Sequence, residues 1–141
     1  MPILNYTTKI DVFKTLGEIQ RILVNHGAKR IIQDYDDNER VASILFMIDT
    51  PSGPRGIRLP ANVDGVLRAL KADGVKTDYE RAERVAWRIV KDWLEAQMAI
   101  LEAQMVQMDE IFLPYMLDNG GSRTLYEVYR ENQLLLSGGE G

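Results

Sequence analysis

"ERVAWRIVKDWLEAQM", residues 83–98, is the stretch that decides the fold, because its spacing predicts the longest helix of the chain. Around it, apolar residues recur every three or four positions, the interval at which side chains share one face of a helix. They are Ala82, Ala86, Ile89, Val90, Trp93, Ala96, Ile100 and Leu101. We expect a helix from about Asp78 to about Met105, with Trp93 in the core. Trp87 lies at the edge of the stripe, where core packing and partner contact both stay open.

The opposite side of this helix carries a basic ridge. Its four residues are Arg81, Arg84, Arg88 and Lys91. Cations spaced by one or two helical turns could line up along a phosphate backbone. The simpler interpretation is a solvated face with ion pairs to the interleaved glutamates, because charge opposite an apolar stripe is usual on a surface helix. We favour the solvated face and keep phosphate contact as the alternative.

Three Thr-x-x-Glu patterns mark helix starts, because such a capping box satisfies two backbone N–H groups at a helix N-terminus. They run from Thr15 to Glu18, from Thr77 to Glu80 and from Thr124 to Glu127. The first helix would end before Gly27, which can take the left-handed conformation. A further helix begins after Asn62 and ends before Gly74. The inward residues are Leu16, Ile19, Ile22 and Leu23 in the first helix, and Val63, Val66, Leu67 and Leu70 in the further one.

The stretches between these helices predict antiparallel strands. "AKRIIQDY" (28–35) and "RVASILFMID" (40–49) are joined by "DDNE", and "TPSGPRG" (50–56) reverses the chain into the short strand "GIRLP" (56–60). Residues 3–10 add one more strand. "SILFMI" (43–48) is apolar on both faces, so this central strand is covered on both sides, or by helix on one face and a partner on the other. The expected fold is α+β, with a small antiparallel sheet of about four strands and helices mainly on one face.

Length and composition indicate a single domain over residues 1–141. Residues 1–60 hold most strands plus the first helix, residues 62–106 hold helices, and residues 107–141 form a return segment and a tail. The chain has no cysteine, no signal-peptide pattern and no apolar run of the roughly 18 residues that span a bilayer. We expect a cytoplasmic protein. Its net charge of −4 lacks the basic surface of a general nucleic-acid binder, and after Lys91 the only basic residues are Arg123 and Arg130.

No motif commits the chain to a reaction. His26, the only histidine, lies in the last turn of the first helix, where a cationic imidazole interacts well with the helix dipole. The acids of "DYDDNE" (34–39) resemble a calcium loop, but Glu39 replaces its glycine and Leu45 its bidentate acid, so we interpret them as a hairpin turn. Glycine-rich phosphate loops are missing as well. We expect no catalytic residue, no metal ligand and no cofactor.

The loop "TPSGPRGIRLP" (50–60) is the first stretch that could contact a ligand. Its prolines and glycines shape a turn that carries Arg55 and Arg58, and two arginines can clamp an anion. Arg58 alternates with Ile57 and Leu59, so it should stand on the opposite face of the sheet. The alternative is a tight hairpin with two ordinary surface cations.

"MDEIFLPYMLDN" (108–119) is the second such stretch. Pro114 disfavours a continuous helix, and the dense apolar residues around it either pack on the long helix as core or enter a partner. The acids at the rim of this segment suit a basic partner. The candidate partner-binding residues are Asp109, Glu110, Phe112, Tyr115 and Asp118.

Six segments of the chain follow a shared pattern: "NYTTKI" (5–10), "TLGEIQRILVNHGA" (15–28), "SILFMIDTP" (43–51), "GIRLPANVDGVLRAL" (56–70), "RVAWRIVKDWLEAQMAILEAQM" (84–105) and "FLPYM" (112–116). On these segments most of the chain, residues 4–117, resembles a family of small proteins encoded by bacteriophages and mobile elements. The resemblance implies a context and no activity at particular positions. Small phage proteins without catalytic motifs often act by binding, and frequently by blocking a host enzyme or a defence system.

The preferred hypothesis is therefore a non-enzymatic, stoichiometric inhibitor or adaptor that binds a host protein, for example a nuclease of a CRISPR defence. The missing catalytic motifs, the acidic tail and the apolar segment 111–117 favour it. The alternative is a module that binds nucleic acid or a nucleotide signal through Arg55, Arg58 and the basic ridge, with strongly salt-dependent affinity. An enzyme that uses carboxylates is the least favoured. A homodimer formed through the long helix stays open.

Overall fold

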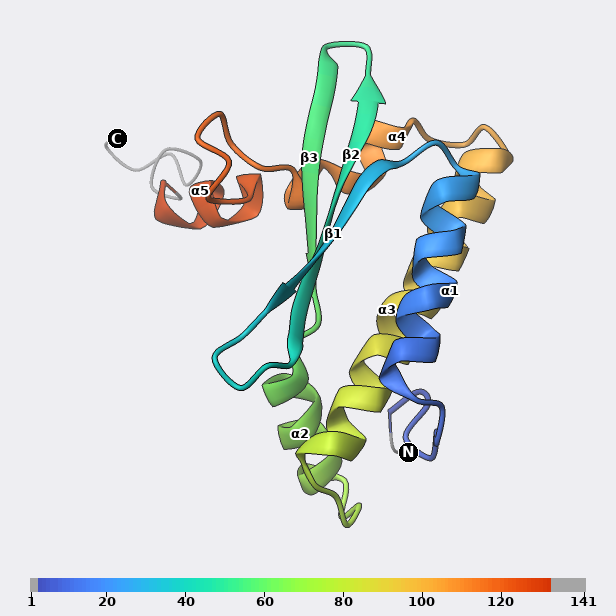
Figure 1. Ribbon diagram of the computed structural model, residues 1–141, viewed down its shortest axis with the longest axis vertical. Coiled ribbons are helices and arrows are strands. Elements are labelled where there is room, and N and C mark those ends of the chain that lie inside the picture. Colours follow the sequence, from blue (N-terminus) through green and yellow to red (C-terminus); the bar gives the residue numbers. More distant parts are fainter. Residues whose placement is uncertain (1–2, 133–141) are drawn as a thin grey trace.

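The computed structural model describes residues 3–132 and shows an α+β fold (Figure 1). Its elements are α1 (Val12–Asn25), β1 (Lys29–Tyr35), β2 (Val41–Thr50), β3 (Gly53–Pro60), α2 (Val63–Ala72), α3 (Tyr79–Glu102), α4 (Met108–Phe112), the 3₁₀ turn η1 (Leu113–Tyr115) and α5 (Leu125–Glu131). In the described range the sheet has three antiparallel strands in the order β1-β2-β3. Helices α1 and α3 lie side by side over one face of it. The predicted class is confirmed, and the tail beyond Asn132 lies outside the described residues.

The strand predicted at residues 3–10 is wrong, because this segment forms turns. The N–H groups of Tyr6 and Thr8 donate to the carbonyls of Ile3 and Asn5 at 3.3 and 3.0 Å. Asn5 has a φ of 65°, which an extended strand does not allow. Its side-chain amide donates to the Asp92 carboxylate on α3 at 2.7 Å. The N-terminal segment is thus tied to the helices and adds nothing to the sheet.

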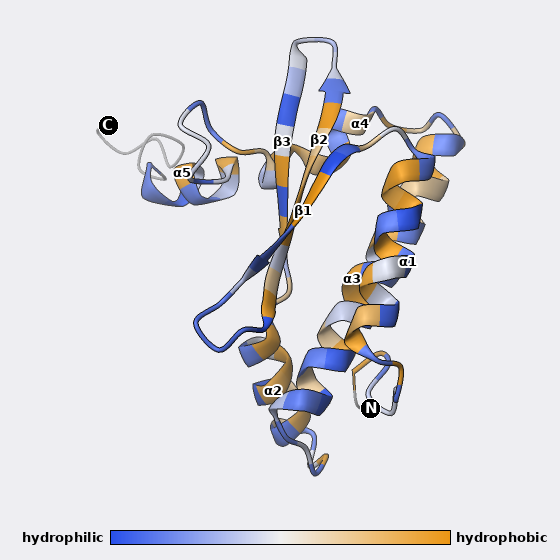
Figure 2. Cartoon of the chain, in the orientation of Figure 1, coloured by the Kyte–Doolittle hydropathy of each residue, from blue (hydrophilic) through white to orange (hydrophobic). Residues whose placement is uncertain are grey.

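The central strand β2 has two different faces. Ile44, Phe46 and Ile48 are buried under the helices, while the intervening Leu45 and Met47 point outward and are only half-buried. Figure 2 shows hydrophobic residues through the middle of β1 and β2 as well as along the helices. Of the two arrangements expected for this apolar strand, the structure has the long helices on one face only, while the short helix α5 lies beside β3 on the other side of the sheet.

The turn between β2 and β3 is shorter than predicted. Only Pro51 and Ser52 separate the strands, and β3 starts at Gly53 instead of near Gly56. Two features close this turn: the Thr50 hydroxyl donates to the Gly53 carbonyl at 2.7 Å, and Gly53 has a φ of 108°, which favours glycine. Part of the predicted loop, including Arg55, therefore lies in the strand ladder.

The helix starts follow the predicted pattern in part. The capping box at Thr124 is confirmed, and α2 has the expected cap at Asn62. The box at Thr15 is wrong: α1 begins at Val12, the Asp11 carboxylate accepts from the Phe13 N–H at 2.9 Å, and Thr15 is fully buried inside the helix. The N-cap is Asp11 and not Thr15, and the helix therefore starts four residues earlier than predicted. On α3 the cap is Asp78, one residue after the predicted Thr77.

The buried side of α3 is rotated from the predicted stripe. Trp87 is fully buried, whereas Trp93 is half-buried and Ala96 is exposed. The reason is that α3 is covered from several directions, by α1, by α2 and by the sheet, and not along a single line. The fully buried or nearly buried side chains of α3 are Ala82, Glu83, Val85, Ala86, Trp87, Leu94 and Met98. The open question for Trp87 is settled as core packing.

The return segment packs as core. Phe112 is fully buried and makes an edge-to-face contact with Phe46, with ring centroids 5.3 Å apart. Trp93 contacts the rings of Phe112 and Tyr115 at 6.1 and 5.7 Å. Beyond η1, Met116 forms an antiparallel bridge with Ile57, so the chain runs along the outer edge of β3. The segment 108–116 therefore completes the hydrophobic core.

Candidate functional site

The basic ridge of α3 is neither a solvated face nor a row of open cations. The Arg88 side chain is 12% exposed and pairs with Glu18 of α1, while the Lys91 side chain is 14% exposed and pairs with Glu95 at 2.7 Å. Arg81 donates to the Lys76 carbonyl, and Arg84 is half-buried with its Nε enclosed. The predicted solvated face is wrong at Arg88, because α1 packs over it, whereas the predicted ion pairing with an interleaved glutamate is confirmed for Lys91 and Glu95. Contact of this ridge with a phosphate backbone would need aligned and exposed charges, and these four residues do not provide them.

Arg55 and Arg58 do not converge on one ligand. They are three residues apart on a strand, so their side chains leave opposite faces of the sheet. Arg55 donates to Ser52 and to the Pro54 carbonyl at the hairpin tip. Arg58 shares the outer face with Leu45, as expected from its alternation with Ile57, and donates to the Ser122 carbonyl at 3.1 Å. The two arginines therefore do not form an anion clamp. The loop is the tight hairpin that the sequence offered as the alternative.

The acidic segment has mostly structural contacts. Glu110 accepts from the Gln107 N–H at 2.9 Å as part of the α4 cap. Asp118 closes the turn before α5: desolvation opposes its ionisation, but bonds from the N–H groups of Ser122 and Arg123 lower its pKa overall. Phe112 is fully buried and Tyr115 half-buried, so the aromatic pair expected to meet a partner serves the core. Asp109 is half-buried.

His26 lies where the sequence predicts, as the residue that ends α1. Its Nδ1 is 2.8 Å from the Ile22 carbonyl, and its Nε2 is 2.7 Å from a carboxylate oxygen of Glu102 at the end of α3. The Ile22 hydrogen bond, followed by the Glu102 contacts, raises the pKa of His26 against the opposing effect of burial. His26 thus links the end of α1 to the end of α3.

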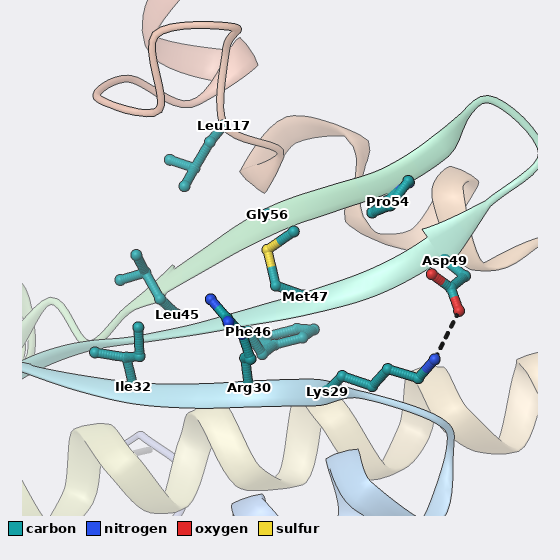
Figure 3. Close-up of a pocket in the computed structure, with 10 residues that line it drawn as sticks. All are labelled: Lys29, Arg30, Ile32, Leu45, Phe46, Met47, Asp49, Pro54, Gly56 and Leu117. Atoms are coloured by element: carbon teal, nitrogen blue, oxygen red, sulfur yellow. Dashed lines mark hydrogen bonds and ion pairs between the residues drawn. The ribbon is translucent and has the colours of Figure 1, made fainter.

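The structure does bring one set of residues together that the sequence analysis did not select. A groove of about 470 Å³ runs over the outer face of the sheet, the face that points away from α1 and α3 (Figure 3). Its apolar lining comes from all three strands and the return segment, with Ile32, Leu45, Met47 and Leu117 as the larger side chains. Ile32 is 52% exposed, an unusual value for an isoleucine in a strand. We call this feature the outer groove.

The outer groove is held open by its backbone. Met47 stands opposite Gly56, which has no side chain to fill the space, and a Cβ built at Gly56 would lie 3.2 Å from a methyl carbon of Leu117. The return segment closes one side, since the Leu117 N–H donates to the Gly56 carbonyl at 2.8 Å. A second groove of about 530 Å³ shares Met47, Gly56 and Leu117 and continues to Leu125 at the start of α5. The two grooves are therefore contiguous from β1 to α5, and the second one has a more polar lining, which includes Asp118 and Asn119.

Charged groups stand at one end of the outer groove and in its middle. Lys29 and Asp49 pair across β1 and β2 at 3.4 Å. Arg30 rises from β1 toward Leu45 and Met47, on the same side of the sheet as Leu117 (Figure 3). Within residues 3–132 its guanidinium has no hydrogen-bond or ion-pair partner. The groove thus combines an apolar floor with one uncompensated cation.

The described residues hold no group of three acidic or histidine side chains placed to bind a metal ion. None of the helices in residues 3–132 is long and apolar enough to cross a membrane. Comparison with known protein families, with curated proteins and with solved structures found no match to this chain.

One sequence signal pointed to the outer groove. "SILFMI" is apolar on both faces, and the outward members of that run are Leu45 and Met47. The two residues that complete the groove, Ile32 and Leu117, come from segments interpreted as a plain strand and as a possible interface. Only the register of β1 with β2 and the return along β3 bring the four together.

Proposed function

We propose that this protein acts by binding another protein, and that the outer groove is the contact surface. The observation that carries this proposal is the apolar strip of Ile32, Leu45, Met47 and Leu117 on the face of the sheet opposite the helices. An exposed apolar patch rimmed by polar groups is typical of a protein interaction site. Burial of this strip against a partner would remove its apolar area from water, which is the main favourable term in association.

The shape of the groove favours a protein segment over a small molecule. Small-molecule sites enclose most of their ligand, whereas this groove is open along its length and continues into the second groove toward Leu125. A groove that is open to solvent and joined to a second one can accept an extended chain.

The expected class of partner is a host protein, with a nuclease of a defence system as the leading candidate. This part of the proposal rests on the absence of a catalytic motif in the sequence and on the resemblance to small phage and mobile-element proteins. The acidic residues that the sequence predicted to bind the partner are not the proposed contact, because Glu110 and Asp118 accept hydrogen bonds in local caps. The outer groove therefore replaces the acidic segment as the proposed contact.

Affinity capture with matched variants tests the proposal. Wild-type protein, the groove variant Met47→Glu and the control Phe13→Glu are each presented to bacterial lysate after nuclease treatment and at high salt. Phe13 is 64% exposed and lies on α1, on the other side of the molecule from the groove. We expect a protein that wild type and Phe13→Glu retain and Met47→Glu loses. The captured protein, once purified, is titrated with the wild type to find whether its activity falls at equimolar ratio.

Two results would contradict the proposal. A partner retained equally by Met47→Glu would place the contact elsewhere on the molecule. Recovery of nucleic acid in untreated lysate, with no protein left after nuclease and salt, would transfer the function to the arginines. Circular dichroism and thermal unfolding of each variant show whether a loss of binding reflects a loss of fold.

A further inference from the structure

Arg30 occupies an unusual position on β1, between Lys29 and Ile32 in the lining of the outer groove (Figure 3). Along the β1–β2 ladder, Lys29 pairs with Met47 and Ile31 pairs with Phe46, so Arg30 is an extra residue without a partner on β2. This arrangement is a β-bulge. Arg30 has a φ of 56°, in the left-handed region that glycine adopts easily and other residues adopt rarely.

The choice of arginine at this bulge needs a reason, because glycine would fit the backbone without strain. Bulges re-aim side chains near binding sites, and non-glycine residues in the left-handed region gather at ligand clamps and switch regions. Here the result is visible in Figure 3: the Arg30 side chain extends over the outer groove, toward Leu45 and Met47. The strained backbone thus delivers a guanidinium to an apolar surface.

The charges on the outer face leave this guanidinium uncompensated. Asp49 is taken by Lys29, and Asp34 accepts from the Ser43 hydroxyl at 3.4 Å. On β3, the other outward cation, Arg58, donates to the Ser122 carbonyl and lies near Glu127. Within the described part of the chain, Arg30 has neither a carboxylate nor a carbonyl partner. A ligand of the groove would meet two cations, Lys29, which is shared with Asp49, and Arg30, which has no acidic neighbour among the described residues.

We propose that the segment bound in the outer groove is acidic as well as apolar, with a carboxylate set against Arg30 and apolar side chains between Ile32 and Met47. This inference rests on the proposed function and specifies the chemistry of its partner. An arginine paired with a carboxylate forms two parallel charge-assisted hydrogen bonds, which fix the position of the partner along the groove. The apolar strip supplies the buried area of the contact. Arg30 fixes the position of the bound segment along the groove and selects segments that carry a negative charge.

The experiment is selection from a displayed library of random peptides on the full-length protein. Wild type serves as bait, and Met47→Glu removes peptides that bind elsewhere. Selected peptides are then measured against Arg30→Gly, which suits the left-handed backbone, and against Arg30→Asn, which also tolerates it. Arg68→Ala, on the exposed side of α2, is the control for loss of one positive charge.

We expect the peptides that depend on Met47 to carry Asp or Glu next to apolar residues. Arg30→Gly should weaken their Kd by roughly tenfold to a hundredfold, the range for one lost charge-assisted contact. Arg68→Ala should leave the Kd unchanged. Selection on Arg30→Glu should enrich Lys and Arg at the position that Asp and Glu occupied.

Failure of this inference and failure of the proposed function give different results. Peptides that need Met47 but lack acids, and that bind Arg30→Gly as tightly as wild type, would overturn the acidic specificity and leave the groove as the contact surface. Selected peptides that bind Met47→Glu and wild type equally would overturn both. A selection that yields no peptide dependent on Met47 counts as the same negative result.

Discussion

The guanidinium of Arg88 on α3 donates to the carboxylate of Glu18 on α1, and it also lies 3.4 Å from the Thr15 hydroxyl. This contact is the polar link inside the α1–α3 interface, between residues 70 positions apart in sequence. Arg88, which the sequence pattern placed in a possible phosphate-binding ridge, therefore links helix α3 to helix α1.

Loss of this link should destabilise the fold. We expect Arg88→Ala to lower the free energy of unfolding by about 2 kcal/mol, the magnitude for a hydrogen bond to a charged group left without its partner. The value stays below that of a fully buried pair because Glu18 is 37% exposed. Urea unfolding followed by circular dichroism measures it. The exposed Arg68→Ala is the control, and equal midpoints for the two variants would contradict the assignment.

The contact between His26 and Glu102 should make the free energy of unfolding depend on pH. The folded state raises the pKa of His26 above its ordinary 6.5, first through the Ile22 carbonyl and then through Glu102. The stabilisation is therefore fully present below pH 6.5 and is lost as pH rises through the higher folded pKa. Thermal unfolding across this window should show the decline in wild type and a flatter profile in His26→Gln. A profile that is unchanged in His26→Gln would assign the pH dependence to other groups.

The return segment should behave as core when it is truncated. Phe112 is fully buried against Phe46 and Trp93, so Phe112→Ala should lower the free energy of unfolding by about 3–5 kcal/mol. Its neighbour Leu113 is 51% exposed, and Leu113→Ala should change stability by less than about 0.5 kcal/mol. Denaturant midpoints compare the pair. Similar small losses for both would mean that 108–116 is loosely attached and available to a partner.

The bulge at Arg30 should be more stable with glycine. Arg30→Gly relieves a left-handed residue with a side chain, and we expect a gain of about 1 kcal/mol in the free energy of unfolding. Arg30→Val should lose at least as much, because a β-branched residue tolerates that conformation poorly. Thermal unfolding of both variants tests the strain. A loss of stability in Arg30→Gly would mean that the arginine side chain makes favourable contacts within the fold.

Local patterns in the sequence predicted the elements well where one residue type decides the conformation. Gly27 and Gly74 follow the ends of α1 and α2 with positive φ values, and Thr124 caps α5 as its spacing requires. The acids at 34–39 form the expected hairpin turn, where the Asp36 carboxylate accepts from the Asn38 and Arg40 N–H groups. These contacts lie within a few residues, so local sequence contains them.

Contacts between distant segments were beyond the reach of the same patterns. Helical spacing shows that Arg88 and Lys91 share a side of α3, but only the packing of α1 against that side decides that they are enclosed. Likewise, alternation places Leu45 and Met47 on one face of β2, while Leu117 reaches that face through a return of the chain along β3. The candidate site is made of such long-range placements, which is why the acidic segment was selected in its place.

The course of the return segment also bears on how the protein avoids self-association. Met116 and Leu117 cover β3 at Ile57 and Gly56, and the opposite edge of the sheet is β1. That edge begins with Lys29 and with the Arg30 bulge, and both charge and irregular backbone disfavour the addition of another strand. Edge-to-edge addition of a strand from another copy is thereby disfavoured at the bulged start of β1 and at the part of β3 that the return segment covers.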